Sequence, residues 1–125
     1  MIRLAANIEG YAGHSVQFVP HFRRVFVEIA AEMEVDVAVV TDEQLRAFNE
    51  SEYGEEVDID WIERVRQYDF EARLLPRGPQ YLLIWNSYQD EPVTVAYRVT
   101  GTAESAPAYP GDVRIPGQSA PQPAS

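Results

Sequence analysis

Residues 74–100 of the chain, LLPRGPQYLLIWNSYQDEPVTVAYRVT, carry its clearest secondary-structure signal. Residues 81–85 are a run of large apolar side chains, and the prolines before them prevent a regular element from continuing into them. Residues 93–100 alternate valine or tyrosine with smaller or more polar side chains, the period of a β-strand with one buried face. Turn formers fill residues 86–92. The stretch therefore predicts a hairpin of two antiparallel strands.

Alternation of apolar and polar residues also predicts strands before this hairpin. The acidic residues 32–34 are expected to form a tight turn, after which residues 35–40 pair back on residues 25–30. The strands expected before the hairpin are residues 2–8, 15–19, 25–30, 35–40 and 68–74, with extended structure over residues 57–61.

One short helix is expected, over residues 42–50. Thr41 and Gln44 have the spacing of a capping box, and Leu45 and Phe48 form an apolar stripe with helical spacing. Residues 62–67 fit either a helix or a strand, because both periods can be read in them. The pattern leaves that segment open.

These short strands and the single helix predict an all-β fold for residues 1–100. Seven or eight strands separated by regular turn signals are typical of a single antiparallel β-sandwich, of the jelly-roll or immunoglobulin-like kind. The chain length of 125 residues agrees with one domain and an appendage.

Residues 101–125 are expected to form an extended tail. Sixteen of these 25 residues are Pro, Gly, Ala or Ser, which cannot supply a packed core. Residues 109–116, YPGDVRIP, form an island with apolar side chains within the tail. We expect this island to dock on a partner through Tyr109, Val113, Arg114 and Ile115.

Composition excludes several classes of function. The net charge is −10, and all ten basic residues are arginines that do not cluster, so neither a nucleic-acid partner nor an anionic membrane surface is expected. Without cysteine there are no disulfides, thiolate metal sites or cysteine nucleophiles. The chain shows no signal peptide and no transmembrane run, so membrane insertion is not expected and a cytoplasmic or particle-associated location is favoured.

Candidate catalytic and metal sites are weak. His14 and His21 could meet a carboxylate from Glu28 or Glu32 at a metal, but their spacing matches no known ligand pattern. The nucleophile, phosphate-binding and dinucleotide-binding motifs are all missing from the sequence. We therefore expect a protein that is not an enzyme and has no cofactor or resident metal.

A ligand-binding surface is the more specific alternative. Tyr53 and Tyr88 fall in expected loops, where aromatic rings are exposed and can stack on a sugar. Asp58 and Asp60 end an acidic run after Gly54 that loosely resembles a calcium-binding loop. The two tryptophans, Trp61 and Trp85, could add to an aromatic platform, although Trp85 lies within an apolar run and is expected in the core.

Residues 75–86, LPRGPQYLLIWN, resemble a run found in bacterial pre-peptidase C-terminal-like and GOLD-like domains. In those domains the glycine, here Gly78, allows a turn, the tyrosine, here Tyr81, packs, and the asparagine, here Asn86, caps the next turn. Residues 35–48, VDVAVVTDEQLRAF, are similar to their strand followed by a short helix. The resemblance covers about 40 residues and implies a small non-catalytic sandwich that contacts other proteins. The missing signal sequence and the proline-rich tail depart from that pattern.

The sequence thus favours a non-catalytic structural or interaction protein. We expect a subunit of a larger assembly, such as a homo-oligomer, a filament or a virus-like shell, in which the tail docks on a neighbouring subunit. Its partner is then protein, either another copy of the chain or an adjacent subunit. The alternative is a module that binds carbohydrate or calcium.

Overall fold

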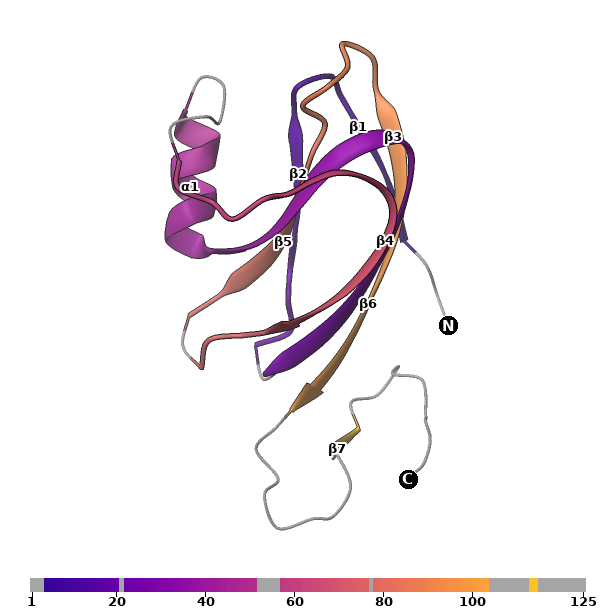
Figure 1. Cartoon of the computed structure of the whole chain (residues 1–125). Coiled ribbons are helices and arrows are strands. Elements are labelled where there is room, and N and C mark those ends of the chain that lie inside the picture. The colour runs from indigo at the N-terminus through magenta and orange to yellow at the C-terminus, as the bar shows by residue number, and fades with distance from the viewer. Residues whose placement is uncertain (1–3, 21, 52–56, 77, 104–112, 115–125) are drawn as a thin grey trace.

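In the part of the chain that the structure describes, the fold is mostly β-structure with one short helix (Figure 1). The computed structural model describes residues 4–20, 22–51, 57–76, 78–103 and 113–114. The elements in chain order are β1 (Leu4–Ile8), β2 (Gly13–Gln17), β3 (Arg24–Thr41), α1 (Asp42–Glu50), β4 (Ile62–Arg73), β5 (Gln80–Trp85), β6 (Val93–Ala103) and β7 (Val113–Arg114).

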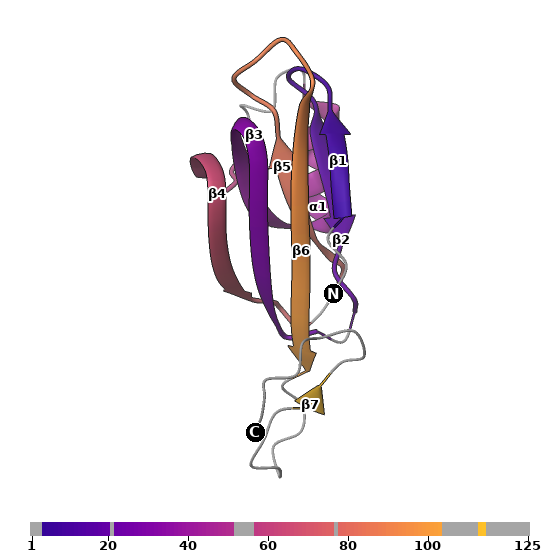
Figure 2. The same cartoon turned by 90° about the vertical axis from the view of Figure 1, so that its right-hand side faces the viewer.

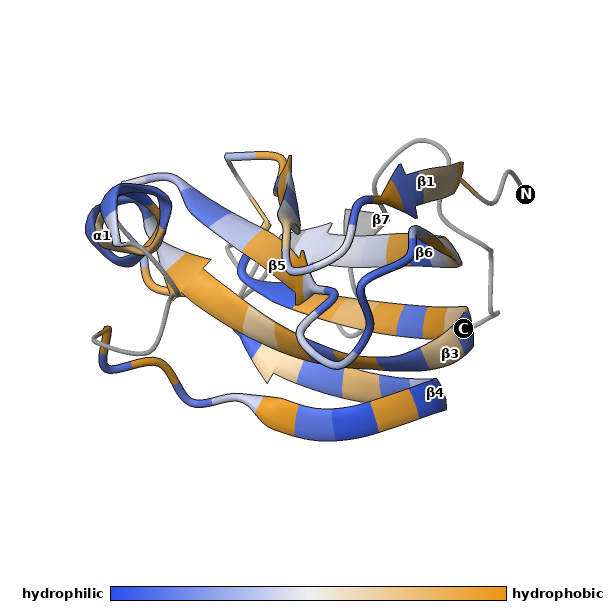
Figure 3. Ribbon diagram, turned by 90° about the horizontal axis from the view of Figure 1, so that it is seen from above, coloured by the Kyte–Doolittle hydropathy of each residue, from blue (hydrophilic) through white to orange (hydrophobic). Residues whose placement is uncertain are grey.

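All the described strands belong to one antiparallel sheet that curls into a half-barrel (Figure 3). Along the sheet the strands follow the order β1-β6-β3-β5-β2, with β4 paired to β3 and β7 paired to β6. The all-β class and the single helix are confirmed. The β-sandwich of seven or eight strands is not confirmed, because the strands do not divide into two facing sheets.

The long strand β3 organises this sheet. Along one side it pairs with β4. Along its other side, Arg24–Ala31 pair with β6 and Asp36–Thr41 pair with β5, so β5 and β6 follow one another beside β3. The predicted hairpin is therefore wrong in its pairing, although both of its strands form. The two strands do not pair with each other: β5 lies between β3 and β2, and β6 lies between β3 on one side and β1 and β7 on the other.

The predicted turn at residues 32–34 is also wrong, because β3 runs without a break from Arg24 to Thr41. Its pairing with β4 shifts register between Ala30 and Val35, which is a β-bulge or irregularity rather than a reversal. Glu32 and Met33 are exposed at this point. The charged residues Glu32 and Glu34 interrupt the apolar pattern here, and from the sequence alone this interruption is indistinguishable from a turn.

We call this part of the sheet the bend: residues 31–36 of β3 together with the loops 9–12 and 86–92. The two loops lie side by side, because the strand before the first loop, β1, pairs with the strand after the second, β6, and the strand after the first, β2, pairs with the strand before the second, β5. At Gly10 an added Cβ would lie 2.2 Å from the backbone oxygen of Asp90, so only glycine allows the loops to approach this closely.

The larger hydrophobic core fills the concave side of the half-barrel. Val25, Val27 and Ile29 of β3 point into it with the period of two that their sequence predicts. The other buried members are Ala6, Ile8, Phe18, Phe22, Val35, Val37, Val65, Leu74, Leu82, Ile84, Val93, Val95 and Tyr97.

A smaller core lies on the convex side, under α1. Phe48 of the helix packs there with Ala38, Val40 and Leu83. Since this end of β3 is covered on both faces, its residues are apolar almost without interruption rather than alternating. The helix forms over the predicted residues 42–50, and its capping box between Thr41 and Gln44 is confirmed.

The segment that the sequence left open, residues 62–67, is the first half of β4. Tyr68 to Arg73 continue the same strand, as the alternation there predicted. Residues 57–61 lie outside the sheet and cover the smaller core with Val57, Ile59 and Trp61. At the other end of the chain β6 continues to Ala103.

Candidate functional site

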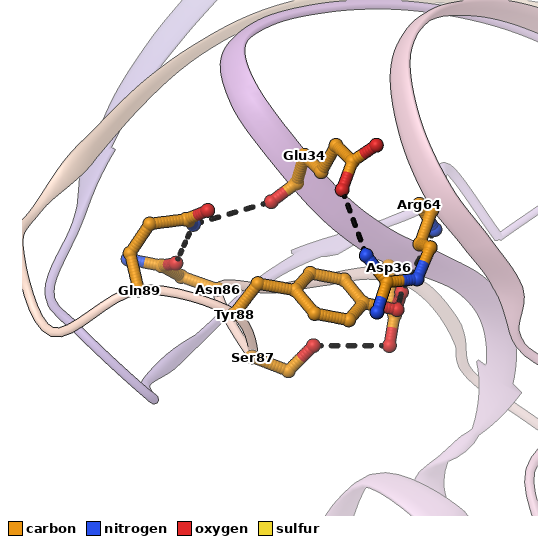
Figure 4. A network of polar contacts seen from close by, with 7 residues as sticks. All are labelled: Glu34, Asp36, Arg64, Asn86, Ser87, Tyr88 and Gln89. Carbon is orange, nitrogen blue, oxygen red and sulfur yellow. Dashed lines mark hydrogen bonds and ion pairs between the residues drawn. The ribbon is translucent and has the colours of Figure 1, made fainter.

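A buried carboxylate stands at the centre of the bend. Asp36 of β3 is 5% exposed and follows a residue of the large core. Its oxygens accept hydrogen bonds from the backbone N–H of Arg64, at 3.1 Å, and from the hydroxyls of Ser87 and Tyr88, at 3.0 and 2.5 Å (Figure 4). A buried carboxylate is stable only when donors replace its water. Asp36 thus ties β4 and the loop 86–92 to β3.

Arg64 reaches the same group from β4. Its backbone has a φ of 58°, an uncommon conformation for a residue other than glycine, next to the register shift between Val35 and Val37. Its guanidinium binds the carboxylate of Glu34 at 3.0 Å and lies 4.4 Å from the centroid of the Tyr88 ring. Arg64 therefore links the irregular part of β4 to β3 by the ion pair with Glu34 and to the loop 86–92 by the cation–π contact with Tyr88.

These contacts occupy Tyr88, one of the predicted ligand-contacting residues. Its hydroxyl donates to Asp36, and the Arg64 guanidinium covers a face of its ring. Desolvation, followed by the hydrogen bond to Asp36, raises the pKa of Tyr88 to about 12. The side chain serves the packing of the bend, and its contact with a ligand stays a prediction.

Asn86 is the second buried polar residue of the bend, with no exposed surface. Its side-chain nitrogen donates to the backbone carbonyls of Ile8, Glu9 and Glu91, at 2.9 to 3.1 Å. Its side-chain oxygen accepts from the amide of Gln89 at 2.6 Å. One side chain thereby connects the end of β1 with the turn that follows β5.

The remaining predicted ligand residues do not join this group. Asp58 and Asp60 are exposed, and their segment is held to α1 by a hydrogen bond from the Gln44 amide to the carbonyl of Asp58. No hydrogen bond or ion pair connects either aspartate with Tyr88 in the described part of the chain. Tyr53 lies outside the described residues.

The two histidines are the candidate metal ligands of the sequence. His14 places its Nε2 3.4 Å from the hydroxyl of Tyr97, with the ring centroids 5.9 Å apart. His21 lies outside the described residues. Within the described ranges, no three His, Asp or Glu side chains gather in a way that could hold a metal ion.

The tryptophans pack together on the convex side of the sheet. The centroids of Trp61 and Trp85 are 5.2 Å apart, and Phe48 meets the Trp85 ring edge-on at 5.4 Å. The indole N–H of Trp85 donates to the carbonyl of Tyr11. Both rings are half-buried against the smaller core, so their first role is packing under α1.

Part of the predicted docking island is visible. Val113 and Arg114 form β7, which pairs antiparallel with the end of β6: Arg114 faces Thr102, and Val113 faces Ala103. Because Thr102 also faces Arg24 of β3, β7 lies on the same side of β6 as β1. Tyr109 and Ile115 are outside the described residues.

Sequence reasoning missed Asp36 and Arg64, which help to hold the bend. The resemblance implied a turn-capping role for Asn86, but not its bonds to the end of β1. Asp36 carried a signal, since it is the one charged residue in the otherwise apolar run from Val35 to Val40. Arg64 carried none, because its role depends on the backbone conformation of β4.

The fold and this network define a small antiparallel β-domain in which the buried side chains of Asp36, Gln80 and Asn86 form hydrogen bonds with other groups of the same chain. Comparison with models of protein families found no match, and comparison with curated proteins found none either. In the described residues, no helix is long and apolar enough to cross a membrane.

Proposed function

We propose that this protein is a non-catalytic subunit of a larger protein assembly, such as a homo-oligomer, a filament or a shell, in which the tail of one subunit docks on the sheet of another. The observation that carries the proposal is the pairing of Val113–Arg114 with β6. A segment from the tail adds a strand to the sheet, and strand addition is one way in which the island can dock on a partner.

Strand addition is open to any copy of the chain. It uses backbone hydrogen bonds, so the same segment fits the same place on its own sheet or on a neighbour's. Ten residue steps separate Ala103 from Val113, which allow a reach of about 33 Å when extended. That reach is enough for exchange between adjacent subunits.

The chemistry of the bend supports a non-catalytic role. The buried carboxylate of Asp36 accepts three hydrogen bonds from its own chain, and the Tyr88 hydroxyl is one of the donors. Groups engaged in this way stabilise the fold rather than transfer protons to a substrate. The resemblance to accessory sandwich domains supports the same role, and a cytoplasmic or particle-associated location belongs to the proposal.

The test is the solution mass of the chain, measured by light scattering during size-exclusion chromatography. The intact chain should have a mass several times 14.1 kDa, and a variant ending at Ala103 should have a smaller one with unchanged circular dichroism. A variant ending at Pro116 is the matched control, because it keeps residues 109–116 and should assemble fully. Assembly that survives the truncation at Ala103 unchanged contradicts the role of the tail.

A further inference from the structure

The two outer edges of the sheet differ in charge. At one edge, six of the twelve residues of β4 are charged: Glu63, Arg64, Arg66, Asp69, Glu71 and Arg73. At the opposite edge, β1 (LAANI) and β2 (GHSVQ) contain no acidic residue and no arginine. Figure 2 shows β4 and β1 on opposite sides of β6. We refer to β1 and β2 together as the uncharged edge.

Exposed sheet edges invite pairing with other strands, and proteins block this with charges, bulges or proline. The β4 edge has such protection, since it is charged and has an irregular register at the positive φ of Arg64. The strands of the uncharged edge contain neither charge nor proline. In a chain with a net charge of −10, an edge without any charge is a surface on which two copies meet with little repulsion.

The outer side of β2 presents backbone N–H and C=O groups that could pair with a further strand. The N–H of Phe18 donates to Gln80, and the N–H of Asn86 donates to Ala12, so the even-numbered residues of this ladder face β5. Gly13, Ser15 and Gln17 consequently direct their N–H and C=O groups away from β5. In the part of the chain that the structure describes, β5 is the only strand paired with β2.

Apolar side chains are exposed along the same margin. Leu4 is 51% exposed, Tyr11 60% and Val19 40%. They lie at the start of β1, in the loop between β1 and β2, and just beyond β2. An edge that combines unpaired backbone, absent charge and exposed apolar groups is typical of an interface.

We propose that the uncharged edge pairs antiparallel with the same edge of a second copy, with Ser15 on the two-fold axis. This inference rests on the proposed function and names one of the contacts in its assembly. Ser15 faces Ser15 of the second copy, and Gly13 faces its Gln17. No charged side chains of the two strands meet, and the small residues at the centre allow close approach.

The geometry suits this arrangement on both faces of the sheet. Ser15 is opposite Leu83 and exposed on the convex side, whereas His14 and Val16 are opposite the buried residues Ile84 and Leu82 on the concave side. A two-fold axis perpendicular to the sheet keeps each side chain on its own face. The concave cores of the two copies then face the same way, and the sheet continues from one copy into the other.

Cross-linking tests the register, because the chain has no cysteine. Directly opposed residues of a hydrogen-bonded antiparallel pair have Cα atoms about 5.5 Å apart, within the span of a disulfide. Mild oxidation should convert most of a Ser15→Cys variant into a covalent dimer. Asp69→Cys is the matched control on the charged edge, since the bond from Leu74 to Arg23 places the backbone of Asp69 outward, and it should form little covalent dimer.

Ser15→Pro tests the pairing itself. Proline removes an N–H that points away from β5, so the internal ladder is kept and circular dichroism should not change. In the variant ending at Ala103, Ser15→Pro should reduce a mass of two chains to one. Retention of two chains, or equal cross-linking of the Ser15→Cys and Asp69→Cys variants, overturns the inference.

The two proposals fail in different ways. If the truncated chain is already monomeric and Ser15→Pro leaves assembly of the intact chain unchanged, the edge contact is wrong and the role of the tail stands. If truncation changes nothing and Ser15→Pro alone gives monomers, the edge contact stands and the role of the tail is wrong. An intact chain that is monomeric at every concentration overturns both.

Discussion

The side-chain amide of Asn86 donates to the backbone carbonyl of Ile8 at 3.0 Å. Seventy-eight residues separate the two in sequence, and the contact is buried. A single side chain from the loop after β5 thus holds the end of β1 and satisfies carbonyls that the bend removes from the regular ladder. Since such groups must be paired when buried, Asn86 is expected to contribute strongly to the stability of the bend.

Replacing Asn86 with alanine should lower the free energy of unfolding by about 3 kcal/mol, because buried carbonyls lose their donors and a small cavity forms. Urea unfolding followed by fluorescence measures the change. Asn7→Ala, at an exposed position of β1, should change it by less than about 0.5 kcal/mol. Equal effects of the two substitutions would show that the Asn86 bonds add nothing.

Tyr88→Phe should reduce stability at pH 7 by about 1.5–2 kcal/mol, the usual contribution of a hydrogen bond to a charged group. The pKa of Tyr88 is raised to about 12 in the folded protein, above its ordinary value of 10. Because the pKa of Tyr88 is higher in the folded protein than in the unfolded chain, neutral Tyr88 contributes its full stabilisation below pH 10. This contribution to the free energy of unfolding is lost as the pH rises toward 12.

The stabilities of the natural chain and of Tyr88→Phe should therefore converge between pH 10 and 12. Other tyrosines with a raised pKa, such as Tyr81 and Tyr97, are present in both proteins and cancel in the difference. Denaturant unfolding at pH 7, 10 and 11 measures this. A difference that is constant over the range would mean that Tyr88 ionises at its ordinary pKa.

Thr41→Ala should lower stability by about 1 kcal/mol through loss of the helix cap. The Thr41 hydroxyl accepts from the backbone of Gln44 at 3.1 Å, and the Gln44 side chain accepts from the backbone of Thr41 at 2.9 Å. A helix of nine residues depends on such bonds and on its packing. Thr41→Ser keeps the cap and should restore most of the loss in thermal unfolding.

Gly101→Ala should lower stability by about 1–3 kcal/mol by overpacking the core. A Cβ at this position would lie 2.1 Å from Cδ2 of Phe22, which is 7% exposed and has little room to move. The substitution should be much less harmful in a Phe22→Ala background, where the ring is absent. Additive effects in this double-mutant cycle would argue against the clash.

Much of the secondary structure could be predicted because it depends on local sequence. The alternation of Val25, Val27 and Ile29 reports one buried face, and the Thr41–Gln44 capping box reports a helix start. The pairing of strands could not be predicted in this way. The local sequence of residues 80–85 does not indicate that these residues pair with Asp36–Thr41 rather than with the strand that follows them.

The polar network in the bend could not be predicted either, because it also depends on residues that are distant in sequence. The sequence shows that Tyr88 is an aromatic residue in a loop. Its hydrogen-bond acceptor, Asp36, and its cation–π partner, Arg64, are distant in sequence. The ligand contacts expected of Tyr53, Asp58 and Asp60 remain predictions. A single charged residue within an apolar run, such as Asp36 between Val35 and Val37, is the sequence signal that indicates a buried polar network.

The place of β6 between β1 and β3 has a consequence for how the protein is made. During translation β1 and β3 are synthesised before β6, so β6 must insert between them after both have emerged from the ribosome. Until Val93–Ala103 emerge, the facing edges of both strands are open in the nascent chain, a state that favours aggregation. Completion of the sheet must therefore wait until nearly the whole domain has been translated, and factors that shield nascent chains should raise the yield of folded protein.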